Sequence, residues 1–422
     1  MKEQSMAEKT IEKLYSGYAI AIDENINSPD SDDRILDIVQ QIEEEGIPLV
    51  KYDAIPKNEN FIKNIKSVSF FILDWELNPN DKGEPHSEDQ VELQLGDAVK
   101  DSSFEDNVKF IESIKENCFA PVFIFTAFDT DTVIEWLLKS EKNLYDVEDE
   151  SKNFILIRKK SEITGKKQMF DSISDWINSN PSIYTLKKWE ENFYKAKNST
   201  FLELYSSSPI WPTVLWKAFN KDSVHEGLSI DEIIYRNIKG RGPLLELNPD
   251  IVNNDEKNED HTPEEIRSLV INSQFVFDDS IPSNDLQPGD IFKGEKKNVY
   301  YINIRPICDT VIDRETCDGI VYCLRGKKVS DKSVSEKFNE KYGYINQRDN
   351  EYIVFGIERS KFVSFSLSSL YQFEFKELKE SRLQRLLPPH ITNLQQKYSG
   401  YLGRIGLPRT FKEIIPVIED PS

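Results

Sequence analysis

Four short apolar segments of the chain each end in side chains that could do chemistry. Asp23 and Glu24 follow Tyr18–Ile22, Asp74 ends the apolar part of Phe70–Leu77, Thr126 follows Pro121–Phe125, and Lys159 and Lys160 follow Phe154–Arg158. Carboxylates suit a hard cation, and a hydroxyl and an ammonium group suit negative charge. Because complementary groups recur at the ends of four segments, we interpret them as one site with Asp74 at its centre.

The apolar segments have the length and composition of buried strands. A run of four to eight apolar residues between polar ones is typical of a parallel strand, and ligands of parallel sheets bind at the carboxyl ends of the strands. Pro48–Ile55 is a further strand candidate, and stretches with helical spacing, such as Ile35, Ile38, Val39 and Ile42, lie between the strands. Up to about residue 180 we therefore predict an α/β domain, a doubly wound parallel sheet with the strand order 2-1-3-4-5.

A polar stretch from Asn78 to Ser103 separates the strand that precedes Asp74 from the next helix, which is predicted over Phe104–Glu116. Its length exceeds that of an ordinary connection. We therefore interpret it as a functional flap or a disordered insertion.

After residue 180 the pattern of residue types changes twice along the chain. Residues 181–280 have helical spacing with few strand signals, and they predict a helical domain. Residues 281–376 contain short segments rich in Val, Ile, Tyr and Phe between turn residues, which is typical of a small antiparallel barrel or sandwich. Residues 377–422 read as a helical tail, with one helix before Pro388 and Pro389 and another after them.

Composition narrows the possible partners and the location. The net charge of −21 and the pI near 4.8 oppose binding to a phosphate backbone over most of the surface, so nucleic acid is an unlikely partner. The first residues lack the apolar core of a signal peptide, and no apolar run approaches the roughly eighteen residues of a membrane span. We expect a cytoplasmic protein with no membrane contact.

The order of the groups in the first 180 residues resembles that of the receiver domain of two-component response regulators. The resemblance implies that Asp23 and Glu24 hold Mg²⁺, that Asp74 accepts a phosphoryl group, and that Thr126 and Lys159 contact the phosphoryl oxygens. It also implies that the backbone carbonyl of Glu76 is a metal ligand. The activity expected from it is at most autophosphorylation from a phosphodonor.

Two departures from the receiver pattern concern spacing and the lysine. The stretch from Asp74 to Thr126 is lengthened by the insertion, and Lys160 and Ser161 follow the lysine where the family usually has proline. Whether Lys159 or Lys160 faces the phosphate is thus left open. The whole chain, with YLGRIGLPR near its end, more loosely resembles divergent response-receiver proteins of bacterial conflict and defence gene clusters. That resemblance implies a protein partner, a kinase or an ATPase encoded nearby.

Two functions of different classes follow. The first is a non-enzymatic signalling adaptor of a defence or stress system, in which a receiver-like domain senses phosphorylation or a partner and the other parts deliver the output; it could also form homo-oligomers. The second is an effector or modulator that acts on nucleic acid through the β-rich part, in the manner of a small SH3-like barrel, which LQPGDIF and YYINIRPI resemble.

Overall fold

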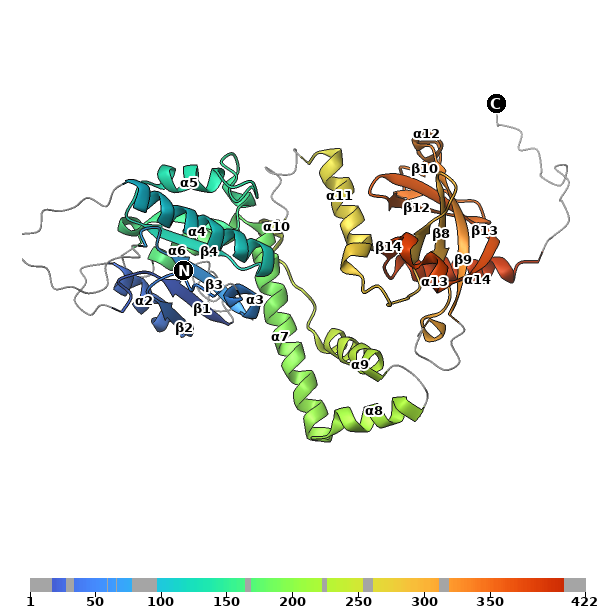
Figure 1. Ribbon diagram of the computed structural model, residues 1–422, viewed down its shortest axis with the longest axis horizontal. Coiled ribbons are helices and arrows are strands. Elements are labelled where there is room, and N and C mark those ends of the chain that lie inside the picture. Colours follow the sequence, from blue (N-terminus) through green and yellow to red (C-terminus); the bar gives the residue numbers. More distant parts are fainter. Residues whose placement is uncertain are drawn as a thin grey trace, which may run out of the picture. The chain divides into compact units, whose positions relative to one another are not determined.

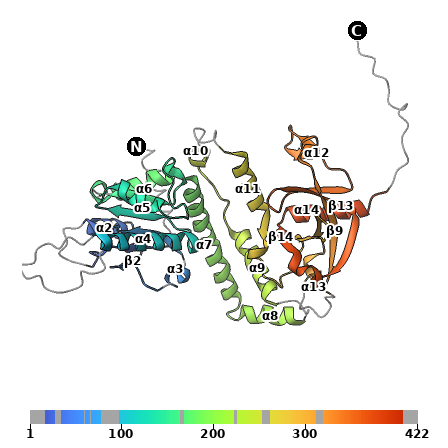
Figure 2. The same ribbon diagram turned by 45° about the horizontal axis from the view of Figure 1, so that its top comes forward.

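The chain forms two compact units. The first comprises Met1–Ser207 and Ile234–Asn258, and the second comprises Ser208–Ile233 and Glu259–Ser422. This computed structural model describes residues 17–27, 34–58, 60–65, 67–77, 97–163, 168–221, 226–252, 261–310 and 319–405. Figure 1 and Figure 2 label the elements of both units.

The first unit is built on a five-stranded, all-parallel sheet. Its strands are β1 (Tyr18–Ile22), β2 (Leu49–Tyr52), β3 (Val68–Leu73), β4 (Val122–Thr126) and β5 (Ile155–Lys159). They lie in the order β2-β1-β3-β4-β5, and every neighbouring pair is parallel. The strand order 2-1-3-4-5 predicted from the sequence is therefore confirmed.

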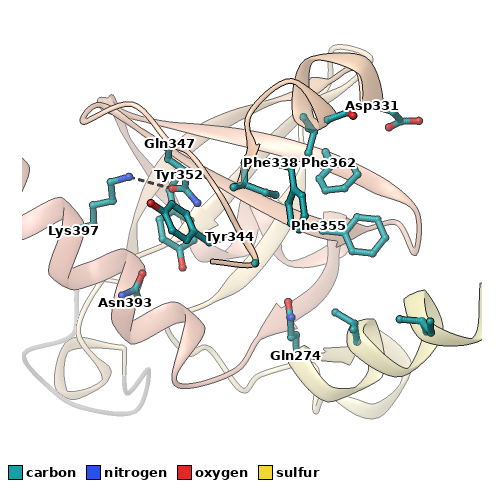
Figure 3. Close-up of a pocket in the computed structure, with 16 residues that line it drawn as sticks. Gln274, Asp331, Phe338, Tyr344, Gln347, Tyr352, Phe355, Phe362, Asn393 and Lys397 are labelled. Carbon is teal, nitrogen blue, oxygen red and sulfur yellow. Dashed lines mark hydrogen bonds between the residues drawn. The ribbon is translucent and has the colours of Figure 1, made fainter. Parts of the chain in front are cut away.

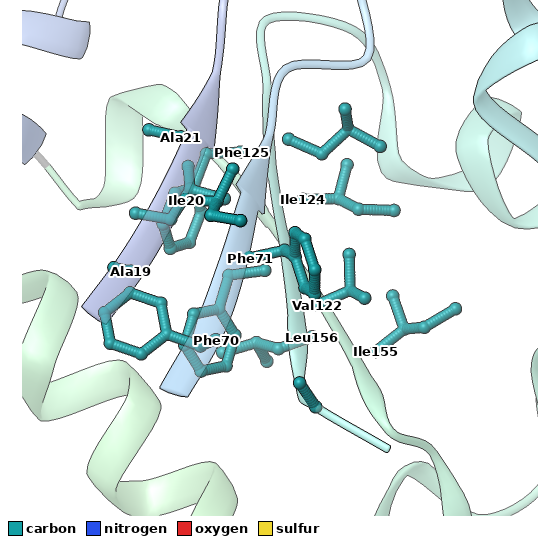
Figure 4. Close-up of a cluster of buried hydrophobic side chains, with 14 of the residues drawn as sticks. Ala19, Ile20, Ala21, Phe70, Phe71, Val122, Ile124, Phe125, Ile155 and Leu156 are labelled. Atoms are coloured by element: carbon teal, nitrogen blue, oxygen red, sulfur yellow. The ribbon is translucent and has the colours of Figure 1, made fainter. Parts of the chain in front are cut away.

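Burial explains why these strands are apolar throughout. Every residue of β3 and β4 is buried, although successive side chains of a strand point to opposite faces. Both faces of the sheet must therefore be covered, as is usual for parallel sheets. Figure 4 shows side chains such as Phe70, Phe71 and Phe125 within the resulting core.

Four helices connect the strands and a fifth follows β5, and together they form two groups. They are α2 (Ile35–Glu44), α3 (Phe61–Asn64), α4 (Asp97–Asn117), α5 (Thr130–Leu138) and α6 (Gln168–Asn178). Helix α2 contacts α6, whereas α4 contacts α3 and α5. The residues predicted to form one face of α2, Ile35, Ile38, Val39 and Ile42, are all buried. Of the predicted insertion Asn78–Ser103, residues 78–96 lie outside the described residues, and α4 begins at Asp97.

The helices predicted between residues 181 and 280 belong to both units. Helices α7 (Pro181–Ser207) and α10 (Pro249–Val252) are part of the first unit, α8 (Trp211–Lys221) and α11 (Pro263–Gln274) of the second, and α9 (Glu226–Arg241) spans the boundary. Helix α7 is tied to the sheet by Lys187, which is 1% exposed and donates a hydrogen bond to the Ser69 carbonyl of β3 (2.6 Å). A buried ammonium needs such a partner, so this contact anchors the first turns of α7.

The second unit contains a curled antiparallel sheet of seven strands in the order β12-β13-β9-β8-β7-β14-β6. Its strands are β6 (Phe275–Phe277), β7 (Asp290–Lys293), β8 (Val299–Asn303), β9 (Ile320–Val329), β12 (Glu351–Ile357), β13 (Lys361–Glu374) and β14 (Arg382–Leu386). A separate hairpin consists of β10 (Phe338–Asn339) and β11 (Tyr344–Ile345), and the helices are α12 (Asp331–Ser335), α13 (Phe375–Leu378) and α14 (His390–Leu402). The antiparallel β-rich part that the sequence predicted is confirmed, and its sheet also includes β6 and β14, which lie outside the predicted range 281–376.

One buried side chain links the two ends of this sheet. The Gln384 amide on β14 donates a hydrogen bond to the Gly356 carbonyl of β12 (3.2 Å) and accepts one from the Glu358 backbone N–H (3.1 Å). Since β12 is an edge strand and β14 lies next to the opposite edge, the sheet must curl to make these bonds. The amide thus satisfies backbone groups that an edge strand would leave unpaired.

The first of the two helix predictions after residue 377 is wrong. Residues Arg382–Leu386 form strand β14, which pairs with both β7 and β6. The local sequence LKESRLQRLL is rich in good helix formers, which explains the prediction. Arg382, Gln384 and Arg385 are nevertheless buried against polar partners of other strands, and these tertiary contacts outweigh the local preference. The second predicted helix corresponds to α14.

Candidate functional site

The two central carboxylates follow neighbouring strands of the parallel sheet. Asp23 comes directly after β1 and Asp74 directly after β3, and the Asp74 backbone N–H donates to the Ile22 carbonyl (2.9 Å). Both side chains are buried, Asp23 at 0% and Asp74 at 4% exposure. The sheet therefore brings together two acids that lie far apart in the chain.

A buried lysine lies between these acids. The Lys160 Nζ is 2.9 Å from the Asp23 Oδ2 and 2.9 Å from the Asp74 Oδ2. Lys160 itself is 6% exposed, at the start of the short 3-10 helix Lys160–Glu162 that follows β5. We name these three residues the Asp–Lys–Asp cluster; such buried, charge-paired groups at strand ends are typical of functional sites.

The resemblance to receiver domains first assigned the contact with the phosphoryl oxygens to Lys159. Lys159 is not part of the Asp–Lys–Asp cluster. Its Nζ lies 2.9 Å from the Asp129 Oδ1 near the protein surface. Because Lys159 is the last residue of β5 and the chain turns directly after it, the next side chain, Lys160, points to the acids. Of the two lysines that the sequence left open, Lys160 is thus the one that faces Asp74.

Backbone donors hold both carboxylates in place. The Asn25 N–H donates to the Asp23 Oδ1 (2.9 Å), and the Glu76 N–H donates to the Asp74 Oδ1 (3.3 Å). Each acid therefore has one oxygen bound to the local backbone and one facing Lys160. The two turns present the carboxylates in a fixed direction, as a preorganised site requires.

The remaining predicted residues lie at the same edge of the sheet. Leu73 pairs with Ile124, so Asp74 and Thr126 both follow within two residues of that pair. Thr126 is buried, and its Oγ1 accepts a hydrogen bond from the Phe128 N–H (3.0 Å). Glu24 and Glu76 are half-buried beside the acids that they adjoin.

One residue that sequence reasoning missed is Asn107 of α4. Its Nδ2 donates to the carbonyl of Trp75 (2.8 Å), the residue after Asp74. Trp75 is fully buried and its ring packs against Phe104 at 5.7 Å. Helix α4 therefore fixes the backbone that carries Asp74. A polar residue on the otherwise apolar face of the predicted helix was the available signal.

Burial and charge set the protonation of the cluster. Burial, opposed by Lys160 and reinforced by Asp23, raises the pKa of Asp74 to about 7. Burial lowers the pKa of Lys160, but the carboxylates of Asp74 and Asp23 outweigh it and raise that pKa above its ordinary value. Lys160 thus stays an ammonium, whereas Asp74 exchanges its proton near neutral pH.

The donors of the cluster fit a hard divalent cation. Mg²⁺ is usually held by one or two carboxylates together with water, and Asp23 and Asp74 supply two convergent carboxylates with one compensating positive charge. The described residues contain no group of three or more His, Cys, Asp or Glu side chains placed to hold a metal. A cation here would consequently rely on water and on backbone carbonyls for its other ligands.

A concave feature lies in the second unit (Figure 3). It is a pocket of about 1060 Å³ between α11, the β10–β11 hairpin, β12 and α14, and its walls include Phe338, Tyr344, Tyr352, Phe355 and Phe362. At one side the Lys397 Nζ donates to the Gln347 Oε1 (3.1 Å) and to the Glu351 carbonyl (2.8 Å). Its aromatic walls suit an apolar group, but we take the Asp–Lys–Asp cluster as the primary site because its charged groups are buried and converge.

Comparison with models of protein families, with curated proteins and with solved structures found no match to this chain. None of the helices in the described part of the chain is long and apolar enough to cross a membrane.

The protonation of Asp74 predicts how the stability of the first unit depends on pH. Because the folded pKa of about 7 exceeds the ordinary value of 3.8, the folded protein keeps a proton that the unfolded chain loses above about pH 4. The free energy of unfolding should fall as pH rises toward 7, by at most about 1.4 kcal/mol per pH unit from this group. Asp74→Asn lacks this titration.

We therefore expect the stability of Asp74→Asn relative to the wild type to increase between pH 5 and pH 8. Hydrogen exchange of the peptide that covers β3, in EDTA and corrected for intrinsic rates, measures this difference. Asp129→Asn, which changes an exposed acid, serves as the control with no such trend. A difference between Asp74→Asn and wild type that is constant with pH would contradict the raised pKa of Asp74.

Proposed function

We propose that this chain is a signalling adaptor whose first unit carries a receiver-like phosphoacceptor, Asp74. The observation that carries the proposal is the Asp–Lys–Asp cluster, in which a buried carboxylate at the end of a central parallel strand meets a buried ammonium at 2.9 Å. An acid that is buried, is fixed by the backbone and has a pKa of about 7, so that about half of it is ionised at neutral pH, suits a nucleophile that acts under cellular conditions.

The proposed reaction is phosphoryl transfer from a small phosphodonor. An oxygen of the ionised Asp74 carboxylate forms a bond to phosphorus while the bond from phosphorus to the donor's leaving oxygen breaks, and the electron pair of that bond departs with the leaving group. Lys160 is in reach to stabilise the negative charge on the phosphoryl oxygens, and the Thr126 hydroxyl lies at the same edge of the sheet.

A bound Mg²⁺ would supply positive charge that screens the acids from the incoming phosphoryl group. Asp23 and Asp74 would hold it, with Glu24 and the Glu76 carbonyl as the further ligands that the receiver resemblance implies. In its absence the Lys160 ammonium provides part of that charge, which fits its position between the two carboxylates.

The output of such a switch would pass through the elements around the cluster. Helix α7 follows directly on α6 and is bound to β3 through Lys187 and the Ser69 carbonyl, and β3 is the strand that leads to Asp74. We propose that a protein partner, a kinase or an ATPase encoded nearby as in defence or stress systems, responds to this unit. The Gln384 hydrogen bonds between the two ends of the second sheet support its interpretation as a small barrel. This barrel would deliver the output of the switch.

Incubation with acetyl phosphate and Mg²⁺ tests the proposal. We expect intact mass spectrometry to show one added phosphate on the wild type, none on Asp74→Ala, and none when EDTA removes the metal. Asp129→Ala is the matched control, because Asp129 is also an acid at this sheet edge but is exposed and pairs with Lys159. Phosphate on Asp74→Ala, or its loss in Asp129→Ala, would argue against Asp74 as the acceptor.

A further inference from the structure

Three aromatic rings meet on one face of the second sheet. The Tyr301 ring on β8 lies 5.6 Å from that of Tyr371 and 4.8 Å from that of Phe373, both on β13, and the latter two rings are stacked at 6.2 Å with an interplanar angle of 13°. Between them β9 contributes two buried side chains, Cys323, which is paired with Tyr371, and Val321, which is paired with Phe373. Tyr371 is 39% exposed, so part of this group of rings is accessible to a ligand.

An arginine with an unsatisfied donor adjoins the rings. Arg325 lies directly opposite Tyr301 in the β8–β9 ladder, and it shares the face of Cys323, two residues away. The Arg325 Nε is buried and has no hydrogen-bond partner among the described residues, which also provide no ion pair for its guanidinium. Because buried donors are normally satisfied, this one points to a missing acceptor.

One lysine continues the same face toward the end of β9. Lys327 is two residues beyond Arg325 and is paired with Val299, whereas Lys328 points to the opposite face of the sheet, where it is paired with buried Val363. The Lys328 N–H donates to the Asn298 carbonyl in the β7–β8 turn. That turn itself contains exposed Lys296 and Lys297. The acids nearby are Glu295 in the turn and Glu358, which already pairs with Lys293 and Lys361.

This local excess of positive charge contrasts with the net charge of −21 for the chain. We propose that Tyr301, Tyr371, Phe373, Arg325 and Lys327, named here the aromatic–basic surface, bind single-stranded nucleic acid. Bases stack on the rings, and phosphates accept hydrogen bonds from the positively charged arginine and lysine. An acidic protein would match the charge as well, but a single strand of nucleic acid supplies a ring that can stack with every phosphate.

Fluorescence anisotropy of the full chain with fluorescein-labelled dT12 and rU12, across a range of NaCl concentrations, tests this site. We expect saturable binding at low salt that weakens as salt rises. Tyr371→Ala should lower the affinity about tenfold. Lys327→Gln should reduce the salt slope by about one. The matched controls are Tyr342→Ala and Lys341→Gln, which change a 65% exposed tyrosine and its neighbouring lysine elsewhere in the unit and should leave binding unchanged.

Several results would overturn the proposal. These are no saturable binding at low salt, equal affinity for a duplex of the same length, equal displacement by polyglutamate and by unlabelled dT12, or equal effects of Tyr371→Ala and Tyr342→Ala. Thermal unfolding of each variant separates loss of binding from loss of the fold. Because the site uses no residue of the Asp–Lys–Asp cluster, Asp74→Ala should bind dT12 like the wild type, which distinguishes failure here from failure of the phosphoacceptor proposal.

Discussion

Replacing Lys160 by alanine should slow phosphate incorporation from acetyl phosphate by about 100-fold or more, whereas Lys159→Ala should change it by less than about twofold. The two lysines are adjacent in sequence but differ in position: the Lys160 Nζ contacts both Asp23 and Asp74, and the Lys159 Nζ contacts exposed Asp129. Without Lys160, the negative charge on the phosphoryl oxygens loses its nearest donor. The pKa of Asp74 also rises further, so less of the nucleophile is ionised.

The time course of phosphate incorporation, followed by intact mass at fixed Mg²⁺ and pH, gives both rates. Lys160→Arg separates the effect of charge from that of geometry, because it keeps the positive charge and changes the positions of the hydrogen-bond donors. Hydrogen exchange of β1 and β3 shows whether each variant is folded. If Lys159→Ala slowed the reaction as much as Lys160→Ala, the assignment of the phosphate-facing lysine to position 160 would be wrong.

Replacing Asp290 by asparagine should destabilise the second unit by about 3 kcal/mol, because it removes the fully buried carboxylate that Arg382 and Arg385 share and leaves them only the more exposed acids Asp278 and Asp285. Asp290 at the start of β7 is 0% exposed, and its oxygens lie 2.6 Å from the Arg385 Nε and 3.7 Å from the Arg382 Nη1. The Gln287 N–H donates to it as well (3.1 Å). These bonds join β7 to β14, which lies next to the edge strand β6. Their loss therefore weakens the contact between these two neighbouring strands.

Asp278→Asn is the matched control. It removes another carboxylate from Arg382, at 2.6 Å, but that side chain is 46% exposed, so a loss of no more than about 1 kcal/mol is expected. Urea unfolding followed by hydrogen exchange of the peptides covering β7 and β14 measures both variants in the full chain. Similar losses of stability in Asp290→Asn and Asp278→Asn would contradict the prediction that the burial of Asp290 sets the size of its effect. The double variant Asp290→Leu with Arg385→Leu should recover part of the stability, since no buried charge at that pair remains unmatched.

The sequence alone determined the first sheet and most of the candidate site. Strands buried on both faces must be apolar along their whole length, so β1, β3 and β4 stand out as apolar runs, as do the first three residues of β5. The strand order then followed from the alternation of strands and helices and from right-handed connections. Because side chains that follow parallel strands share one edge of the sheet, the positions of the strands were enough to group Asp23, Asp74 and Thr126.

Other features depended on contacts between distant parts of the chain. Lys159 and Lys160 are the same residue type at adjacent positions, and only the turn after β5 decides which of them reaches the acids. Strand β14 has a helix-like sequence, yet Asp290, ninety-five residues earlier in the chain, pairs with Arg385 within it. Likewise the average charge argued against nucleic acid, whereas the sheet gathers Arg325 and Lys327 beside Tyr301. Composition and local propensity carry no information about such distant pairs, and the energy of a buried charge depends on which partner the tertiary structure brings to it.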